Sequence, residues 1–148
     1  MAWLEVETKV KVSDAKSLRN RIKRIATYVK TEKRGDDYFA LKRKGYPKKA
    51  FRIRYNGKEY VVNFKKWLRH LYSKDIVVKE EFEFTLCDIE HFGNFLALFK
   101  DLGFEEWIKK IKQSESYRYE KDKRVTIELN KVKHLGYFWE IEYLCTQK

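Results

Sequence analysis

The sequence predicts an α+β fold in which an eight-stranded antiparallel β-barrel carries two or more flanking helices. Two observations favour this class. About eight segments alternate between apolar and polar residues, as half-buried strands do, while only two segments have helical spacing. A strand with two glutamates at i and i+2 also runs into a helix twice, at Glu5 and Glu7 and again at Glu81 and Glu83. An open α+β sheet is the second interpretation.

The first half of the chain begins with a strand and a helix. Residues 2–12 alternate cleanly and form the first predicted strand. Ser13 has the chemistry of an N-cap, and apolar residues then recur at helical spacing, which predicts a helix over residues 14–29. Asn56-Gly57 is a typical hairpin turn between two later strands. Those strands and their neighbours are predicted near residues 30–41, 50–55, 58–66 and 76–85.

The second half repeats the order of strand and helix. Asp88 is placed to open a helix that continues through Leu102, and Gly103 is placed to end it. The apolar stripe of this helix consists of Ile89, Phe92, Phe95, Leu96 and Phe99. The last predicted strands lie near residues 107–119, 123–130 and 137–143.

Length and composition limit the class of protein. A chain of 148 residues is about one domain, so we expect residues 1–148 to form a single domain, and 43% hydrophobic residues suffice for a core. No segment approaches the roughly 20 apolar residues that span a bilayer. The N-terminal segment alternates and lacks an apolar signal core, so we expect a cytoplasmic protein without a membrane segment. Cys87 and Cys145 form no paired motif and are expected to be reduced.

The charge of the chain is strongly positive. Lysine and arginine total 34 and aspartate and glutamate total 22, giving a formal net charge of +12. Such a field attracts phosphates, nucleotides or nucleic acid. A salt-rich, solvated surface of a heat-adapted protein explains the same composition. The position of the charges along the strands therefore has to decide between these interpretations.

The polar faces of the predicted strands carry both signs of charge. Carboxylates recur at i and i+2 in three strands, and such pairs repel unless a cation lies between them or water solvates them well. Basic residues alternate in the same way in other strands. For any single strand, a sheet with one wet face is the simpler interpretation. Together the strands favour a bound metal–triphosphate, since carboxylates hold hard cations and Arg and Lys hold phosphate oxygens. The acidic pairs are Glu5 and Glu7, Glu81 and Glu83, and Glu140 and Glu142.

Several of these segments resemble one family of proteins. EVETK at 5–9, DDYF at 36–39, FRIR at 51–54, NFK at 63–65, EEFEF at 80–84 and LGYFWEIEY at 135–143 stand in the order typical of the CYTH superfamily. These proteins are also called triphosphate tunnel metalloenzymes, and they include class IV adenylyl cyclases and thiamine triphosphatases. A single such motif is weak evidence, but the full set in the right order is strong. The resemblance implies an eight-stranded tunnel open to solvent.

The resemblance also implies roles for particular side chains. Divalent metal, Mg or Mn, would be held by Glu5, Glu7, Glu140 and Glu142, with Glu81 and Glu83 assisting. The phosphates would be held by Lys9, Arg52, Arg54, Lys65 and Lys112, and Arg118 could reach in from the same face. The residues implied in catalysis are Glu5, Glu7, Lys9 and Glu128.

Two positions depart from the family pattern. Ser114 stands where a second basic residue is expected, and Asn130 stands where an Asp is expected. An amide cannot act as a charged ligand or general base, so Glu128, two residues earlier on the same face, is the expected substitute. These departures predict either an altered substrate or retained binding with reduced catalysis.

Three functions follow from this reading. The first is a metal-dependent triphosphatase acting on tripolyphosphate, a nucleoside triphosphate or thiamine triphosphate. The second is a class IV adenylyl cyclase that converts ATP to cyclic AMP and pyrophosphate. The third is a non-catalytic binder of polyphosphate or RNA, for which basic residues in the first helix and in residues 42–49 would form a weak nucleic-acid footprint. The resemblance is also compatible with a homodimer.

Overall fold

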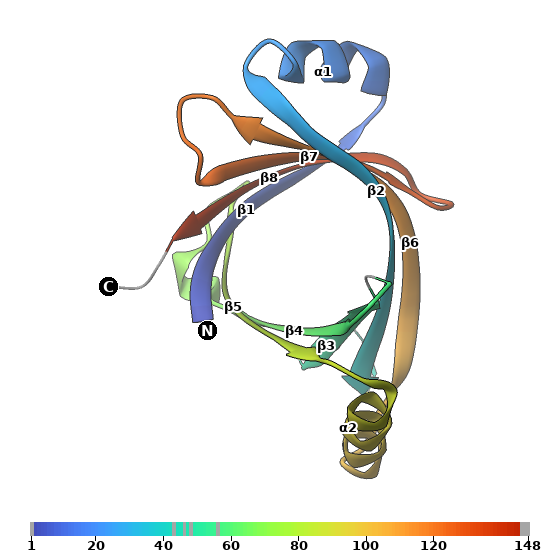
Figure 1. The fold of residues 1–148 in the computed structure, drawn as a ribbon. Coiled ribbons are helices and arrows are strands. Elements are labelled where there is room, and N and C mark those ends of the chain that lie inside the picture. The colour runs from blue at the N-terminus through green and yellow to red at the C-terminus, as the bar shows by residue number, and fades with distance from the viewer. Residues whose placement is uncertain (1, 43, 46, 48, 56, 146–148) are drawn as a thin grey trace.

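The protein forms a closed antiparallel barrel of eight strands (Figure 1). The computed structural model describes residues 2–42, 44, 45, 47, 49–55 and 57–145. The strands are arranged around the barrel in the order β1-β5-β4-β3-β2-β6-β7-β8, and β1 pairs with both β5 and β8. This double pairing closes the sheet, so the predicted barrel is confirmed and the open-sheet alternative is wrong. The strands are β1 (Ala2–Val12), β2 (Ala26–Leu41), β3 (Ala50–Tyr55), β4 (Tyr60–Trp67), β5 (Val77–Leu86), β6 (Phe104–Tyr119), β7 (Val125–Val132) and β8 (Gly136–Cys145).

The β3–β4 hairpin falls where the turn signal predicts it. Asn56 lies outside the described residues, but Gly57 has a φ of 94°, a conformation that favours glycine. Tyr55 pairs with Tyr60 at the end of the hairpin. A short 3-10 helix, η1 (Arg69–Leu71), joins β4 to β5.

The first helix is shorter than its apolar spacing predicts. α1 (Ala15–Ile22) ends after about two turns, and β2 already begins at Ala26. The N-cap is Asp14 instead of Ser13, since the Asp14 side chain accepts a hydrogen bond from the backbone N–H of Ser17 at 2.9 Å. The prediction of a helix to residue 29 is wrong because Ala26 onward pairs with β6, and tertiary pairing outweighs local spacing.

The second helix follows the prediction closely. α2 (Ile89–Asp101) begins after Asp88, whose side chain accepts from the backbone N–H of His91 at 2.8 Å. Gly103, with a φ of 87°, follows its last turn. Ile89 departs from the predicted apolar stripe, since it lies 69% exposed at the first turn.

Two hydrophobic clusters lie on the outside of the barrel, one beneath each helix. Ile22 of α1 packs with Ala26, Tyr117 and Ile127. On the other side of the barrel, α2 covers a cluster that contains Phe39, Phe51, Ile53 and Val62, with Phe92, Phe95, Leu96 and Phe99 packed against it. The helices therefore cover part of the outward apolar surface of the strands, and the opposite faces line the interior.

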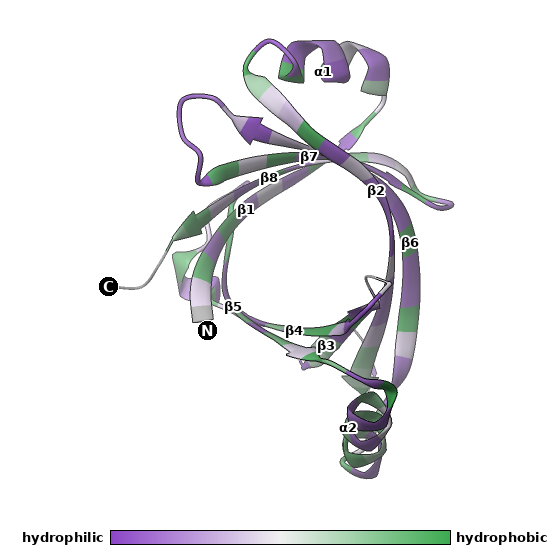
Figure 2. Cartoon of the chain, in the orientation of Figure 1, coloured by the Kyte–Doolittle hydropathy of each residue, from purple (hydrophilic) through white to green (hydrophobic). Residues whose placement is uncertain are grey.

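Hydrophilic and hydrophobic residues follow one another along the strands (Figure 2). Because the outward positions form the clusters beneath the helices, the charged positions face the axis of the barrel. Among the described residues, no helix is long and apolar enough to cross a membrane.

Candidate metal and phosphate site

The interior of the barrel contains an unusual number of buried charges. Burying an ion is costly unless it is paired and hydrogen-bonded, so such a set requires a reason. The charges come from five strands, and buried amide and hydroxyl side chains lie among them. The buried charged residues are Glu5, Asp36, Lys79, Glu81, Glu128 and Glu140, and the buried polar residues are Asn63, Ser114, Ser116 and Asn130.

Three carboxylates converge at the β1–β8 pair. Glu5, Glu7 and Glu142 each place an oxygen so that all of these atoms lie within 4.8 Å of one another. Glu7 stands directly opposite Glu142 in the ladder, and like charges in that position repel. Burial raises the pKa of Glu142 to about 7, and the charge of Glu5 adds to the effect. Oxygen ligands at this spacing fit a hard divalent cation such as Mg or Mn, so the chemistry of these residues suits the implied metal.

The other three predicted metal ligands have protein partners. Glu140 forms an ion pair with Lys9, with 2.6 Å between Lys9 Nζ and Glu140 Oε1. Glu81 accepts a hydrogen bond from Trp3 Nε1 at 3.0 Å, and Glu83 accepts one from Asn63 at 3.3 Å. The structure therefore brings Glu5, Glu7 and Glu142 together, while Glu140, Glu81 and Glu83 contact neighbouring polar side chains.

The two arginines of β3 face the interior with different degrees of pairing. Arg54 donates to both carboxylate oxygens of Asp36, at 2.6 and 2.9 Å. Burial alone would raise the pKa of Asp36, but the hydrogen bonds from Arg54 and the nearby charge of Arg52 hold it below its ordinary value. Arg52 Nε is buried and has no hydrogen-bond partner among the described residues. A buried N–H donor without a partner indicates a place for an acceptor such as a phosphate oxygen.

Basic side chains from neighbouring strands add to this region. Lys110 Nζ lies 4.9 Å from the centre of the Tyr38 ring. Burial lowers the pKa of Lys110, and the nearby charge of Lys9 adds to the effect. Lys112 Nζ lies 3.7 Å from Glu128. An anion would relieve the repulsion among these ammonium groups.

Lys65 on β4 connects the acidic and basic regions. Its Nζ lies 2.5 Å from Glu5 Oε2 and 3.4 Å from Glu81 Oε1. Although burial opposes the charged form, Glu5 and Glu81 raise the pKa of Lys65 well above its usual range. Lys65 therefore stays charged beside the carboxylate cluster, where it can neutralise either a glutamate or a phosphate.

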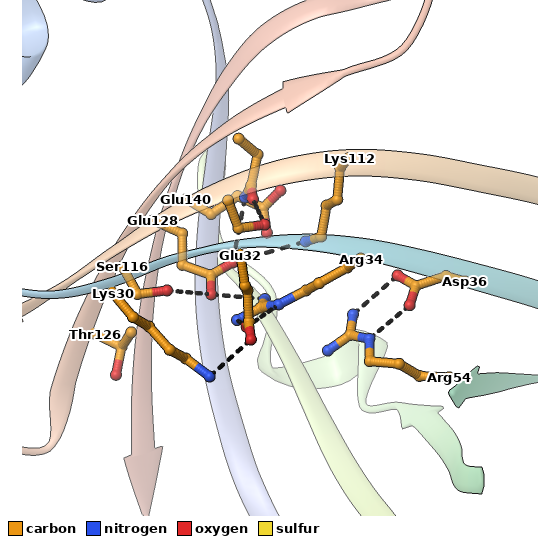
Figure 3. A network of polar contacts seen from close by, with 12 residues as sticks. Lys30, Glu32, Arg34, Asp36, Arg54, Lys112, Ser116, Thr126, Glu128 and Glu140 are labelled. Carbon is orange, nitrogen blue, oxygen red and sulfur yellow. Dashed lines mark hydrogen bonds and ion pairs between the residues drawn. The ribbon is translucent and has the colours of Figure 1, made fainter. Parts of the chain in front are cut away.

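The strand β2 supplies interior residues that the sequence interpretation missed. Arg34 donates to Glu128 at 2.8 Å, and Ser116 Oγ donates to the same carboxylate at 3.1 Å (Figure 3). Burial would raise the pKa of Glu128, but Lys112 and Arg34 lower it, so Glu128 is an ionised carboxylate near neutral pH. The alternation of β2 carried the signal for Glu32 and Arg34, while Asp36 and Tyr38 belong to the DDYF segment, to which the sequence interpretation assigned no role. Lys79 on β5 was also missed, although it lies two residues before Glu81 on the same face.

Arg118 does not join the other basic residues in this structure. Its guanidinium is exposed and donates to the backbone oxygen of Lys123 at 2.9 Å and to Thr126 at 3.2 Å. The two departures from the family pattern, Ser114 and Asn130, are buried and contact each other. Glu128 accepts a hydrogen bond from the Asn130 side chain at 3.3 Å and also contacts Arg34 and Lys112.

Two hollows lie outside the barrel interior. One, of about 340 Å³, is lined by outward residues of β2, β3 and β6 and by Phe92 of α2, and the other, of about 300 Å³, lies between α1 and Trp139. Neither is lined by the acidic cluster. The candidate site therefore rests on buried, convergent charge in the barrel and not on either hollow.

A closed barrel whose interior carries a carboxylate cluster and basic residues is a charged tunnel. The chain belongs to the CYTH family, since a family model described as the CYTH domain matches residues 4–147. A search of curated proteins found no significant match.

Solved structures with the same fold support this membership. The PH1819 protein from Pyrococcus horikoshii OT3 is 29% identical, with a TM-score of 0.73 over 97% of this chain and 80% of that chain. The PH1012 protein from the same organism is 26% identical, with a TM-score of 0.69 and the same coverage. HpAC1 from Hippeastrum, an adenylyl cyclase candidate described as having a dominant triphosphatase activity, is 15% identical, with a TM-score of 0.57 over 97% of this chain and 80% of that chain. At that identity the likeness shows the fold alone.

Proposed function

We propose that this chain is a metal-dependent triphosphatase that hydrolyses a small triphosphate, such as tripolyphosphate, a nucleoside triphosphate or thiamine triphosphate. The observation that carries the proposal is the position of Glu7 directly opposite Glu142, with Glu5 beside both. Two facing, half-buried carboxylates repel each other, and a divalent cation that both bind would relieve this repulsion. The same interior holds Arg52 Nε, which has no hydrogen-bond partner in the part of the chain that the structure describes and is a candidate donor to an anion.

The divalent ion would be held by Glu5, Glu7 and Glu142. When bound, it would neutralise phosphate charge and orient the triphosphate and the attacking water. Arg52 and Arg54 would donate to phosphate oxygens, and Lys65 and Lys112 would add positive charge to the same ligand. In this reaction water adds to the terminal phosphorus, the bond to the bridging oxygen breaks, and orthophosphate and diphosphate leave.

Glu128 has a role that follows from its partners. As an ionised carboxylate it holds Arg34 and Ser116, and its charge lies close to Lys112. We assign it to positioning these groups and to accepting a hydrogen bond from the attacking water. Lys9 is held by Glu140 and would reach a phosphate when that ion pair opens.

The alternative activity is a class IV adenylyl cyclase. The same interior serves both reactions, since cyclisation replaces water by a ribose hydroxyl as the attacking group. The description of HpAC1, a protein with this fold, favours hydrolysis as the first assignment. A non-catalytic binder of polyphosphate is the third assignment, and it is favoured if binding occurs without turnover.

The deciding experiment separates these activities by their products. The purified chain is incubated with tripolyphosphate, ATP or thiamine triphosphate and with Mg²⁺ or Mn²⁺, and orthophosphate, pyrophosphate and cyclic AMP are each quantified. Metal-dependent release of orthophosphate supports the triphosphatase, whereas cyclic AMP with stoichiometric pyrophosphate supports the cyclase. Binding of tripolyphosphate without turnover would reassign the chain as a binder. Full activity in excess chelator would contradict the metal-dependent proposal.

A further inference from the structure

Lys79 is a buried cation that contacts the carboxylate cluster. It stands on β5 directly opposite Glu5 of β1, and its side chain is almost fully buried, with 7% of the residue exposed. Its Nζ lies 3.2 Å from Glu5 Oε1 and also contacts Glu7 Oε2. The ammonium therefore engages two of the three carboxylates that form the candidate metal site.

We propose that Lys79 is a resident cation of this cluster, that an entering divalent ion displaces its ammonium from Glu5 and Glu7, and that the ammonium then moves to Trp67 and Tyr72. This inference rests on the proposed metal-dependent function. It assigns to Lys79 the control of metal affinity.

Competition follows from charge and space. An ammonium and a divalent ion repel each other, so both cannot contact the same pair of carboxylate oxygens at close range. Lys79 has no ion pair with Glu142 among those of the described residues, whereas a divalent ion can bind all three carboxylates. The ion thus gains one more ligand than the ammonium, and Lys79 keeps Glu5 and Glu7 paired when no metal is present.

A place for the displaced ammonium lies on the neighbouring strand and the segment after it. Trp67 of β4 stands directly opposite Lys79 in the ladder, and the centre of its ring lies 5.5 Å from Lys79 Nζ. Tyr72 packs against Trp67, with 6.3 Å between ring centres, and its buried Oη has no hydrogen-bond partner among the described residues. An indole face and a free phenol oxygen are suitable partners for an ammonium.

The first test measures Mn²⁺ binding to chelator-stripped protein by calorimetry at pH 8, without any triphosphate. Lys79→Met removes the competing charge, so we expect its affinity for Mn²⁺ to rise at least tenfold. Lys79→Arg retains the charge and should remain within about threefold of the wild type. The matched control is Lys66→Met, since Lys66 points outward from β4 and pairs with Glu80, and its affinity should not change.

The second test uses a double-mutant cycle to examine whether the displaced ammonium of Lys79 binds Tyr72. Tyr72→Phe removes only the hydroxyl, and we expect it to weaken Mn²⁺ binding roughly threefold in the wild-type background. In the Lys79→Met background the same substitution should have no effect, because no ammonium needs a partner. An equal effect in both backgrounds would overturn the proposed movement of Lys79.

The role of Lys79 can still be tested if the Lys79→Met variant folds poorly. If Lys79→Met is unfolded without metal, Mn²⁺ should restore its circular dichroism and raise its Tm more than it raises that of Lys79→Gln or the wild type. Unchanged or weaker Mn²⁺ binding by folded Lys79→Met overturns the role of Lys79 while leaving the metal-dependent function intact. If neither the wild type nor Lys79→Met binds Mn²⁺, the inference and the proposed function both fail.

Discussion

Ser114 on β6 and Asn130 on β7 stand directly opposite each other, and Ser114 Oγ donates a hydrogen bond to Asn130 Oδ1 at 2.5 Å. Both residues are fully buried. These are the two positions at which the sequence departs from the family pattern of a basic and an acidic residue. The two departures therefore form one neutral pair, and the Asn130 amide group also donates to Glu128 Oε2 at 3.3 Å.

This pairing predicts a structural role for Ser114. Ser114→Ala leaves the buried Asn130 oxygen without its donor, and we expect the free energy of unfolding to fall by about 1–3 kcal/mol. The affinity for tripolyphosphate should change little, because phosphate is held by other residues. Chemical denaturation and calorimetry measure the two quantities, with exposed Ser17→Ala as the control. A tenfold loss of tripolyphosphate affinity with unchanged stability would instead place Ser114 in the phosphate site.

Removing the charge of the acidic cluster should reduce metal-dependent turnover. Glu5→Gln combined with Glu7→Gln should reduce metal-dependent turnover roughly a hundredfold or more while the fold is retained, because two metal ligands lose their charge. Glu80→Gln is the matched control, since Glu80 pairs with Lys66 away from the cluster. Circular dichroism establishes the fold, and orthophosphate release measures turnover. Wild-type activity in the double variant would rule out this cluster as the metal site.

We expect Arg52 and Arg54 to contribute most of the affinity for phosphate. Replacing either by Ala should weaken tripolyphosphate binding roughly tenfold to a hundredfold, since each guanidinium can donate two hydrogen bonds. Lys42→Ala and Arg124→Ala remove exposed charges outside the interior and should have little effect. Titration calorimetry compares the four variants. Equal losses at all four positions would show that a diffuse surface field attracts the anion.

The raised pKa of Glu142 should make the free energy of unfolding of the metal-free chain depend on pH. Its pKa is raised from 4.5 to about 7 by burial and then by the charge of Glu5. Between these values the folded chain keeps a proton that the unfolded chain has released, so this group lowers the free energy of unfolding as pH rises from 4.5 through 7. Glu142→Gln should match the wild type near pH 4.5 and exceed it at pH 8 by on the order of 1–3 kcal/mol.

Urea denaturation across this pH range, with a chelator present, makes the comparison. Addition of Mn²⁺ at pH 8 should stabilise the wild type more than the variant, because the variant lacks one charged ligand. Parallel stability curves for the two proteins would show that Glu142 titrates at its ordinary value.

The basic residues on the surface of α1 are a candidate site for RNA binding. Arg19 is held by Glu115 through hydrogen bonds of 2.6 and 2.7 Å, while Arg21, Lys23 and Arg24 lie beside it on the surface. Arg43 and Lys48, two basic residues of the predicted loop footprint, lie outside the described residues. If the remaining charges form a footprint, the affinity for single-stranded RNA should fall with salt at a log–log slope of roughly −0.7 per phosphate contact.

Filter binding across a salt series, with and without tripolyphosphate, tests this surface. Poor competition by tripolyphosphate indicates a surface site that is separate from the barrel interior, and complete competition indicates that the interior binds both. We expect RNA binding only at low ionic strength. Binding that persists near physiological salt would establish nucleic acid as a partner.

The sequence by itself determined which residues have the chemistry of the site. Glu5 and Glu7 share a face because strands alternate with a period of two, and the same rule places Arg52 beside Arg54. The capping residue Asp88 and the apolar stripe after it determined α2, since both signals are local. The order of the motifs was enough to predict the barrel.

Only the tertiary structure decided which of these side chains meet. Glu142 joins Glu5 and Glu7 because β1 closes the barrel against β8, and Lys79 meets Glu5 through the register of β1 with β5. Likewise, pairing with β6 converted residues 26–29 from predicted helix to strand. Register joins residues that are far apart in the chain, and its energy comes from the packing of the whole barrel, so no local pattern contains it.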